Sequence, residues 1–306
     1  MKEKLLLTTH FGSVLSNRQC DVTELQPCNH VEADTRIMLQ LSHAARQGHK
    51  TTYIRTVNSD IVVLAIRIFE TMGLSELWIG YGSGKKYRDI PVHVISSTIG
   101  ESKSLALPLF HSLTGCDTTS QFLGCGKKTA WAAWNSTPEL TDTLVALTNN
   151  PDLLSIESTH MQNIEHFVVR MYSKGCGAGG VNEARHNLFT TGTKSFESLP
   201  PTQAALFQHV KRALLQASFF WNQATSLQQE LPDFGKWGWH KNDTNEWQPL
   251  WTTLSDASKA CSILLHCGCT KACGGRCKCK RASVRCTTLC KCEGGCVNNG
   301  GDEQLN

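Results

Sequence analysis

Neither a strong excess of one charge nor a long apolar run occurs in this sequence. The 30 Lys and Arg residues exceed the 26 Asp and Glu residues by only four, which excludes a polycation that coats nucleic acid along its whole length. Any nucleic-acid site must therefore be local. The longest apolar run, residues 61–66, falls far short of the roughly 18 residues of a membrane-spanning helix, and the start of the chain has too short an apolar stretch for a secretory signal. We expect an intracellular protein without a membrane partner.

Internal repeats and low-complexity tracts are also absent from the sequence. With 306 residues and 40% hydrophobic content, the chain is long enough for one full domain and a smaller one. Its 15 cysteines are unevenly distributed, because ten of them lie at or after Cys261. Cysteines in a reducing compartment are rarely used for disulfides, so this distribution indicates metal ligation.

The first 175 residues alternate strand-like and helix-like stretches, which predicts an α/β fold with a largely parallel sheet. The patterns predict a helix over 31–47 ended by Gly48, a strand over 51–57, a buried strand or helix over 60–69, a hairpin over 77–95 and a helix over 102–113. Further helices are expected from Lys127, from the cap and first-position pair Thr137 and Pro138, along the apolar stripe Ile164, Phe167, Val168 and Met171, and from Gln203.

The expected domain organisation has four parts. Residues 1–175 form the α/β domain, 176–260 a helical and Trp-rich connector, 261–298 a cysteine-rich domain, and 299–306 a disordered tail. The connector contains four tryptophans that we interpret as packed side chains, because buried or half-buried aromatics are several times more common than base-stacking ones. They are Trp237, Trp239, Trp247 and Trp251.

The cysteine-rich segment has spacings typical of a metal cluster. Three of its spacings are C-x-C, and thiolates one residue apart suit bridging between metal ions. If nine sulfurs serve three tetrahedral zinc sites, twelve coordination positions require three bridging cysteines. The predicted zinc ligands are Cys267, Cys269, Cys273, Cys277, Cys279, Cys286, Cys290, Cys292 and Cys296.

This segment resembles the CXC domain of the tesmin family and of related chromatin proteins. The resemblance rests on the three C-x-C pairs, the gap from Cys279 to Cys286, and the closing Cys296 and Asn298. It implies three zinc ions, DNA binding and a nuclear location. Tesmin-type proteins usually carry two copies, each with a tyrosine that enters the minor groove. This chain has one copy and no such tyrosine, so we expect weak contact directed mainly at the DNA backbone.

The charge of the segment agrees with a DNA partner. Seven basic residues oppose only Glu293 between His266 and Asn298, which gives +6. Three zinc ions and nine thiolates then leave +3, and such a module attracts phosphates with an affinity that falls as salt rises. The basic residues are Lys271, Arg276, Lys278, Lys280, Arg281, Arg285 and Lys291. The alternative is a zinc cluster that only stabilises a small domain or binds a protein partner.

Four acidic residues in the α/β part are candidate ligands of magnesium or manganese. Carboxylates that come from the ends of different strands and helices suit a metal site for phosphodiester cleavage. The candidates are Glu32, Asp34, Asp60 and Asp117. Each is also an ordinary helix-capping or first-turn acid, which is the commoner role. Residues two apart on a helix point about 200° from each other, so Glu32 and Asp34 can share a metal only at a helix start.

The order of these acids resembles the flap-endonuclease branch of the PIN-like nucleases. Glu32 and Asp34 match an acidic pair that opens a helix, Asp60 matches an acid at a strand end, and Gly115 to Asp117 match the next motif. The resemblance implies a helix-two-turns-helix hairpin that holds a DNA phosphate. Its residues here are Gly124, Gly126, Lys127 and Lys128.

Two departures from that family bear on activity. Asn58 stands where the family has an acid, and the acids of its N-terminal strands have no counterpart here. We therefore expect a degraded or N-terminally truncated nuclease with feeble or no cleavage, in an arrangement that also resembles uncharacterised, transposon-associated CXC-domain proteins of metazoans. The leading hypothesis is a nuclear DNA-binding protein. The alternatives are an active metal-dependent, structure-specific nuclease and a zinc-stabilised protein-interaction module.

Overall fold

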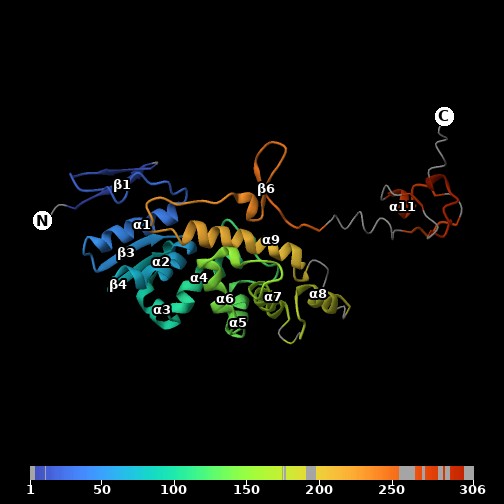
Figure 1. The fold of residues 1–306 in the computed structure, drawn as a ribbon, viewed down its shortest axis with the longest axis horizontal. Helices are drawn as coiled ribbons and strands as arrows, with labels where there is room; N and C mark the ends of the chain where they lie inside the picture. Colours follow the sequence, from blue (N-terminus) through green and yellow to red (C-terminus); the bar gives the residue numbers. More distant parts are fainter. Residues whose placement is uncertain are drawn as a thin grey trace. The chain divides into compact units, whose positions relative to one another are not determined.

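The computed structural model describes residues 4–10, 12–173, 175, 177–190, 198–254, 266–270, 273–281, 285–286 and 290–299. Lys271, the segment 255–265 and the tail from residue 300 lie outside the described residues, so the predictions that fall on them have no structural counterpart. The chain divides into two compact units, Met1–Thr252 and Thr253–Asn306, and each is described by itself (Figure 1).

The first unit is a mixed α/β structure. A hairpin precedes a three-stranded sheet with helices, and a helical part and a second small hairpin follow. Its strands are β1 (Leu7–His10), β2 (Ser13–Ser16), β3 (Thr51–Thr56), β4 (Glu76–Tyr81), β5 (Arg88–Pro91), β6 (Trp239–Lys241) and β7 (Trp247–Pro249). Its α-helices are α1 (Ala33–Arg46), α2 (Ser59–Met72), α3 (Val92–Ile99), α4 (Glu101–Leu113), α5 (Lys127–Asn135), α6 (Leu140–Asn149), α7 (Thr159–Tyr172), α8 (Val181–Thr190) and α9 (Gln203–Leu214).

Short helical turns complete the two units. In the first unit, 3-10 turns are η1 (Gly84–Lys86), η2 (Pro151–Leu153) and η5 (Phe234–Lys236), while η4 (Leu215–Trp221) is a π-helix that continues α9. The second unit contains α11 (Lys278–Arg281) and the 3-10 turn η6 (Val297–Asn299). No helix of the described residues is both long enough and apolar enough to cross a membrane.

The central sheet has the order β3-β4-β5, and only its first pair is parallel. The sheet is therefore mixed, and the prediction of a largely parallel sheet was wrong. A parallel connection needs a crossover of a dozen or more residues, whereas only the short turn around η1 joins β4 to β5. The predicted hairpin is confirmed over these two strands, but residues 92–95 belong to α3 instead.

The ambiguous apolar stretch after β3 is a helix, α2. The Asn58 side chain caps its first turn by accepting a hydrogen bond from the Asp60 amide at 2.9 Å, and Gly73 ends it in the left-handed conformation with φ 63°. Such a stretch cannot be assigned from periodicity alone, because a buried helix and a buried strand are both apolar throughout. The cap and the glycine are the local features that favour the helix.

The start of α6 differs from the prediction that Thr137 caps it and Pro138 opens it. The helix begins at Leu140, with Glu139 at the cap position. The Thr137 hydroxyl instead donates to the Ala133 carbonyl at 2.9 Å and accepts from Arg170 Nη1 at 2.8 Å. It therefore completes the end of α5 and is engaged by α7, which leaves it unavailable as a cap.

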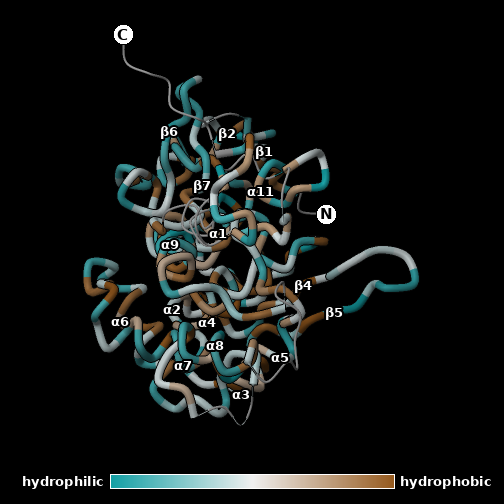
Figure 2. The backbone as a smooth tube through the Cα atoms, turned by 90° about the vertical axis from the view of Figure 1, so that its right-hand side faces the viewer, coloured by the Kyte–Doolittle hydropathy of each residue, from teal (hydrophilic) through white to brown (hydrophobic). Residues whose placement is uncertain are grey.

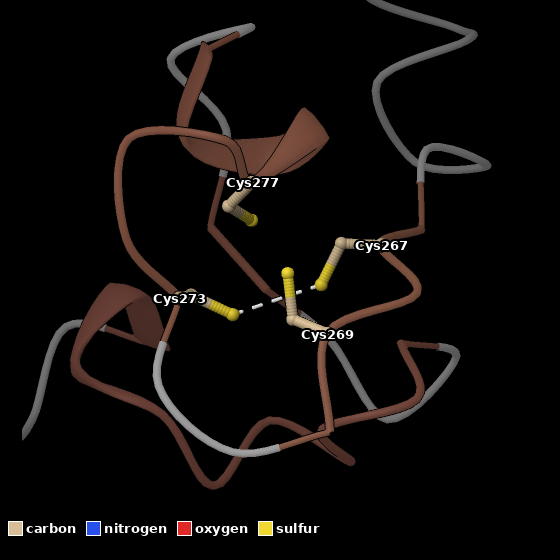
Figure 3. Close-up of side chains that lie close together, drawn as sticks. All are labelled: Cys267, Cys269, Cys273 and Cys277. Carbon is tan, nitrogen blue, oxygen red and sulfur yellow. Dashed lines mark hydrogen bonds between the residues drawn. The ribbon is translucent and has the colours of Figure 1, made fainter.

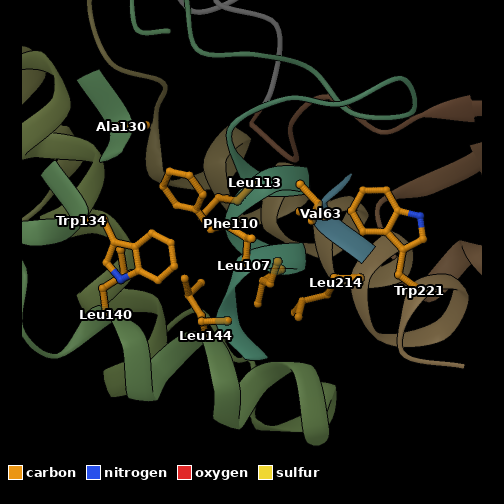
Figure 4. Packing of buried hydrophobic residues seen from close by; sticks show 14 of the residues in the cluster. Val63, Leu107, Phe110, Leu113, Ala130, Trp134, Leu140, Leu144, Leu214 and Trp221 are labelled. Atoms are coloured by element: carbon orange, nitrogen blue, oxygen red, sulfur yellow. The ribbon is translucent and has the colours of Figure 1, made fainter. Parts of the chain in front are cut away.

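Helix α4 lies at the centre of the first unit. Its residues 106–113 are all buried, and it contacts α2, α3, α6, α9 and η4. Phe110 stacks on Trp134 with ring centroids 4.5 Å apart (Figure 4). Brown, hydrophobic segments gather around α2, α4 and α9, and the outer loops are mainly teal and white (Figure 2).

The helices after residue 175 belong to this same core. Leu206, Val210 and Leu214 of α9 are fully buried in the cluster that also contains residues of α2, α4 and α7. The predicted apolar stripe of α7 is confirmed, because each of its residues is buried. Among the tryptophans of residues 237–251, Trp237 is buried and Trp239 is half-buried, whereas Trp251 is 61% exposed.

Candidate metal centre and acidic site

The nine predicted zinc ligands of the second unit meet in one small cluster. Six of them are at most 2% exposed, and all nine belong to groups of four whose sulfur atoms lie within 4.8 Å of one another. These groups are Cys267, Cys269, Cys273 and Cys277; Cys267, Cys286, Cys290 and Cys292; Cys267, Cys277, Cys279 and Cys286; and Cys273, Cys286, Cys292 and Cys296. Figure 3 shows the first group, whose side chains converge from one short loop.

The sulfur spacing matches the edges of zinc tetrahedra. Zn–S bonds of about 2.3 Å in tetrahedral geometry place neighbouring sulfurs about 3.8 Å apart. The Sγ atoms of Cys267 and Cys273 are 3.7 Å apart, those of Cys267 and Cys292 3.8 Å, and those of Cys279 and Cys290 3.6 Å. All three separations are far longer than the roughly 2.05 Å of a disulfide bond. The cluster is thus compatible with a zinc-binding, CXC-like module.

Two cysteines occupy the middle of the cluster. Cys267 and Cys286 each belong to three of the four groups, which is the position of a sulfur that bridges metal ions. The Asn298 side-chain amide donates to Cys286 Sγ at 3.3 Å, and the Cys267 backbone amide donates to Cys290 Sγ at 3.4 Å. Such donors support sulfur in its thiolate form, which is the form that binds metal.

The surroundings shift the pKa values of two of these thiols in opposite directions. The backbone amide of Lys280 donates to Cys277 and lowers the pKa of its thiol to about 6. Burial, together with the neighbouring Cys290, raises the pKa of Cys279 to about 12. A zinc ion would displace the protons of such thiols, so its binding would depend on pH. Cysteines are the only members of its buried apolar cluster among the described residues, so a bound metal would take the place of an ordinary hydrophobic core.

Basic side chains surround this buried cluster. Those that the structure describes are exposed, whereas Lys271 lies outside the described residues. The exposed ones are Arg276, Lys278, Lys280, Arg281, Arg285 and Lys291. Buried sulfur and exposed positive charge therefore belong to the same short segment, and α11 alone carries Lys278, Lys280 and Arg281.

In the first unit, Glu32 and Asp34 lie at the start of α1, which is the position where the two carboxylates could share a metal ion. Glu32 is the residue before the helix and Asp34 lies in its first turn. Glu32 accepts hydrogen bonds from Gln216 Nε2 at 2.8 Å and from Trp221 Nε1 at 3.2 Å. Asp34 accepts one from Asn58 Nδ2 at 2.8 Å. Helix α1 therefore presents both carboxylates toward α2 and the π-helix η4.

Asp60 is buried in the first turn of α2, where it pairs with a histidine. Its Oδ1 lies 2.9 Å from His111 Nε2 of α4, and both side chains are nearly inaccessible to solvent. Asn58 lies between the acids of the two helices, because it donates to Asp34 and accepts from the Asp60 amide. This neutral residue links α1 to α2 at the site.

The four acids influence one another electrostatically. Burial raises the pKa of Asp34 to about 6, with further contributions from Asp60, Glu32 and Asp117. Burial also raises the pKa of Glu32, against the hydrogen bonds from Gln216 and Trp221, while Asp60 and Asp117 raise it further. Asp117 is exposed in the loop after α4. The structure thus brings all four acids into one region, although they come from three separate segments.

The acids form a looser group than the cysteines do. Among the described residues, sets of three or more ligand atoms within 4.8 Å of one another occur in the cysteine cluster, and no such set includes these acids. A cation there would be held by one or two carboxylates directly and by the rest through water, which is a usual arrangement for Mg²⁺.

The glycine and lysine residues predicted to hold a DNA phosphate lie at the start of α5. Gly124 has a φ of 74° and Gly126 is the cap residue of the helix. Lys127 is exposed as a whole, but its ammonium group donates to the His111 carbonyl at 2.5 Å and to Thr114 Oγ1 at 2.8 Å. Burial of that group lowers its pKa to about 8. The Lys127 ammonium therefore faces the acidic site, whereas Lys128 is exposed.

No protein-family model, curated protein or solved structure matches this chain. The chain is therefore described by its own features: a mixed α/β unit and a C-terminal cysteine cluster compatible with a CXC-like zinc module. The PIN-like interpretation of the first unit stays a prediction.

Three residues of the acidic site were not predicted from the sequence. His111, Gln216 and Trp221 contact Asp60 and Glu32 directly, and the last two lie 184 and 189 residues away from Glu32. Gln216 and Trp221 share one local signal, the π-helix η4, since such widened turns occur frequently at functional sites. That signal becomes visible only in the structure.

Proposed function

We propose that the chain is a nuclear DNA-binding protein that contacts duplex DNA through its zinc-loaded, CXC-like module. The observation that carries the proposal is the exposure of the six described basic residues around a buried cluster of nine cysteines. With three zinc ions bound, the segment has a net charge of +3. A positive surface held rigid by metal attracts the phosphate backbone at little cost in ordering entropy.

The test measures duplex binding of the full, zinc-loaded chain by fluorescence anisotropy over a range of salt concentrations. The logarithm of the binding constant should fall linearly with the logarithm of salt concentration, with a slope of about −0.9 for each neutralised phosphate. Arg281→Glu should weaken binding and reduce the slope by about 1. Lys85→Glu, a matched charge reversal on the exposed turn η1, serves as the control and should leave the slope unchanged.

Two results contradict this proposal. One is the absence of duplex binding by the zinc-loaded chain at low salt. The other is an identical salt slope for the wild type and Arg281→Glu. Either result favours a zinc module that serves folding or protein interaction.

A second candidate function is metal-dependent cleavage of DNA in the first unit. It is favoured by the convergence of Glu32, Asp34, Asp60 and Asp117, whose repulsion contributes to the raised pKa of Asp34. Carboxylates that repel one another are stabilised when a divalent cation binds between them. Asn58 in place of a further acid predicts feeble activity. Cleavage of flap or hairpin DNA with magnesium or manganese, lost in Asp117→Ala, supports this candidate, and no turnover with either metal removes it.

A further inference from the structure

A cavity of about 450 Å³ opens beside the acidic site. Four separate segments of the first unit line it: the start of α1, the loop after α4, the end of α9 with its continuation η4, and the segment from η5 to β7. Glu32 and Asp117 belong both to the acidic site and to this cavity. Its volume lies within the roughly 300–1,000 Å³ of small-molecule sites. We call it the aromatic pocket.

Aromatic side chains make up much of the wall. Phe220, Phe234, Trp239 and Trp247 all line the pocket. The Phe234 and Trp247 rings have centroids 5.6 Å apart and planes inclined by 55°, and those of Phe220 and Phe234 are 6.3 Å apart and inclined by 48°. Because Trp247 is 39% exposed, the wall remains accessible to a flat ring from solution.

Polar groups with fixed orientations lie at the acidic end. The Gln216 amide donates to Glu32 at 2.8 Å and accepts from the Thr118 hydroxyl at 2.9 Å. These two bonds determine which end of the amide is the donor and which is the acceptor. The Thr118 oxygen keeps acceptor capacity after this donation.

A buried cation completes the lining. Arg212 is 4% exposed, and its Nη1 donates to the carbonyl oxygens of Gly238 at 3.0 Å and Leu250 at 2.7 Å. A guanidinium has five N–H donors, and within the described part of the chain no carboxylate pairs with this one. The indole N–H of Trp239 also has no hydrogen-bond partner among the described residues. The pocket lining therefore has N–H donors that are not paired with its own acceptors.

We infer that the aromatic pocket binds an unpaired nucleobase, next to the acidic site. A base offers two flat faces for stacking against the aromatic wall, and its ring nitrogens and carbonyl oxygens accept hydrogen bonds from donors such as Arg212. An alkylammonium ion also suits an aromatic wall, and Glu32 and Asp117 would attract it. It has no acceptors for the N–H donors of the lining, however. The inference extends the proposed DNA-binding function from the duplex to a single-stranded end.

The test uses the full, zinc-loaded chain and a DNA duplex with a short single-stranded overhang that carries 2-aminopurine. Calcium is present to neutralise the carboxylates beside the pocket. Stacking of the fluorescent base should lower its emission on binding. An otherwise identical overhang with an abasic site at that position should bind more weakly by about 5- to 150-fold, the range expected for one stacked base. This comparison needs no protein variant, so a folding defect cannot account for it.

Variants locate the effect in the pocket. Trp247→Ala should lose the preference for the base over the abasic site, and Trp247→Phe should recover most of it, because a smaller aromatic ring still stacks. Trp78→Ala is the matched control, since Trp78 is a half-buried indole of β4 that does not line the pocket. Blunt-duplex binding should be the same in Trp247→Ala and in the wild type.

Equal binding of the base-containing and abasic overhangs overturns the inference, as does an unchanged preference in Trp247→Ala. Tetramethylammonium that occupies the pocket, without any preference for the base, overturns it in favour of an alkylammonium ligand. Failure of the proposed function gives a different result: blunt-duplex binding is then absent or insensitive to Arg281→Glu, while the comparison between base and abasic site remains measurable.

Discussion

Replacement of Asp34 by asparagine should stabilise the first unit at pH 8 and leave its stability unchanged at acidic pH. In the folded protein, burial and the neighbouring acids raise the pKa of this carboxyl from 3.8 to about 6. Because the folded-state pKa is the higher one, ionisation of Asp34 opposes folding. The protonated carboxyl carries no such penalty below pH 3.8, and the folded state loses this stability as the pH rises through about 6. An amide does not ionise, so the variant avoids the loss.

The size of the effect follows from the difference between the two pKa values. The change from 3.8 to about 6 corresponds to about 3 kcal/mol at most, and partial exposure of the side chain reduces this to about 1–2 kcal/mol. For a unit of this length, 1 kcal/mol shifts the melting temperature by about 2–4 °C. We therefore expect Asp34→Asn to melt about 2–8 °C higher than the wild type at pH 8.

Tryptophan fluorescence measures this transition selectively, because all eight tryptophans lie before residue 252. Melting curves are recorded at pH 8 and pH 4 without magnesium or manganese. Asp243→Asn, a matched change in the exposed turn between β6 and β7, should show no such difference between the two pH values. Equal melting temperatures of Asp34→Asn and the wild type at pH 8 refute the reasoning, since the carboxylate then experiences no net penalty.

Three further predictions concern zinc, a buried pair and a buried histidine. Native mass spectrometry should find three zinc ions in the wild type. Cys267→Ser should lose more than one ion and Cys296→Ser at most one, because Cys267 belongs to three sulfur groups and Cys296 to one. One ion or none in the wild type contradicts the cluster. His111→Ala should destabilise the first unit by about 2–4 kcal/mol in urea denaturation, because Asp60 loses its buried partner; a loss below 1 kcal/mol contradicts the pairing. Burial lowers the pKa of His209 from 6.5 to about 4, so its contribution is complete above pH 6.5 and falls by about 3 kcal/mol as the pH drops toward 4. His209→Gln should weaken this acid sensitivity in melting curves, and an unchanged pH profile rules out that assignment.

Features that depend on nearby residues are predictable from the sequence, whereas contacts between distant segments are not. The predicted zinc ligands lie within thirty residues, so their spacing alone predicted one cluster. The helix over 31–47 and the strand over 51–57 were confirmed within a few residues, because their signals are local too. The acids were predicted from ordered motifs, whereas Gln216 and Trp221 contact Glu32 from 184 and 189 residues away. No periodicity records such a contact.

Two predictions for the first unit were wrong. Thr137 has the residue type of a helix cap, but Arg170 and the end of α5 engage its hydroxyl. The sheet was expected to be largely parallel, but only β3 and β4 pair in parallel, whereas β4 and β5 form the predicted hairpin. For Thr137, the residue type correctly predicts a side-chain hydrogen bond at a helix end, but not that the partners are Ala133 and Arg170.

The enclosure of α4 has a consequence for cooperativity. Its neighbours extend from α2 to η4, so the covering of one helix depends on segments from residue 59 to residue 221. Removing any of them exposes part of a helix whose residues 106–113 are all buried. The backbone amides of α4 should therefore exchange with deuterium only through opening of the whole unit, and a fragment that ends before α9 should not retain the slow exchange of the intact unit.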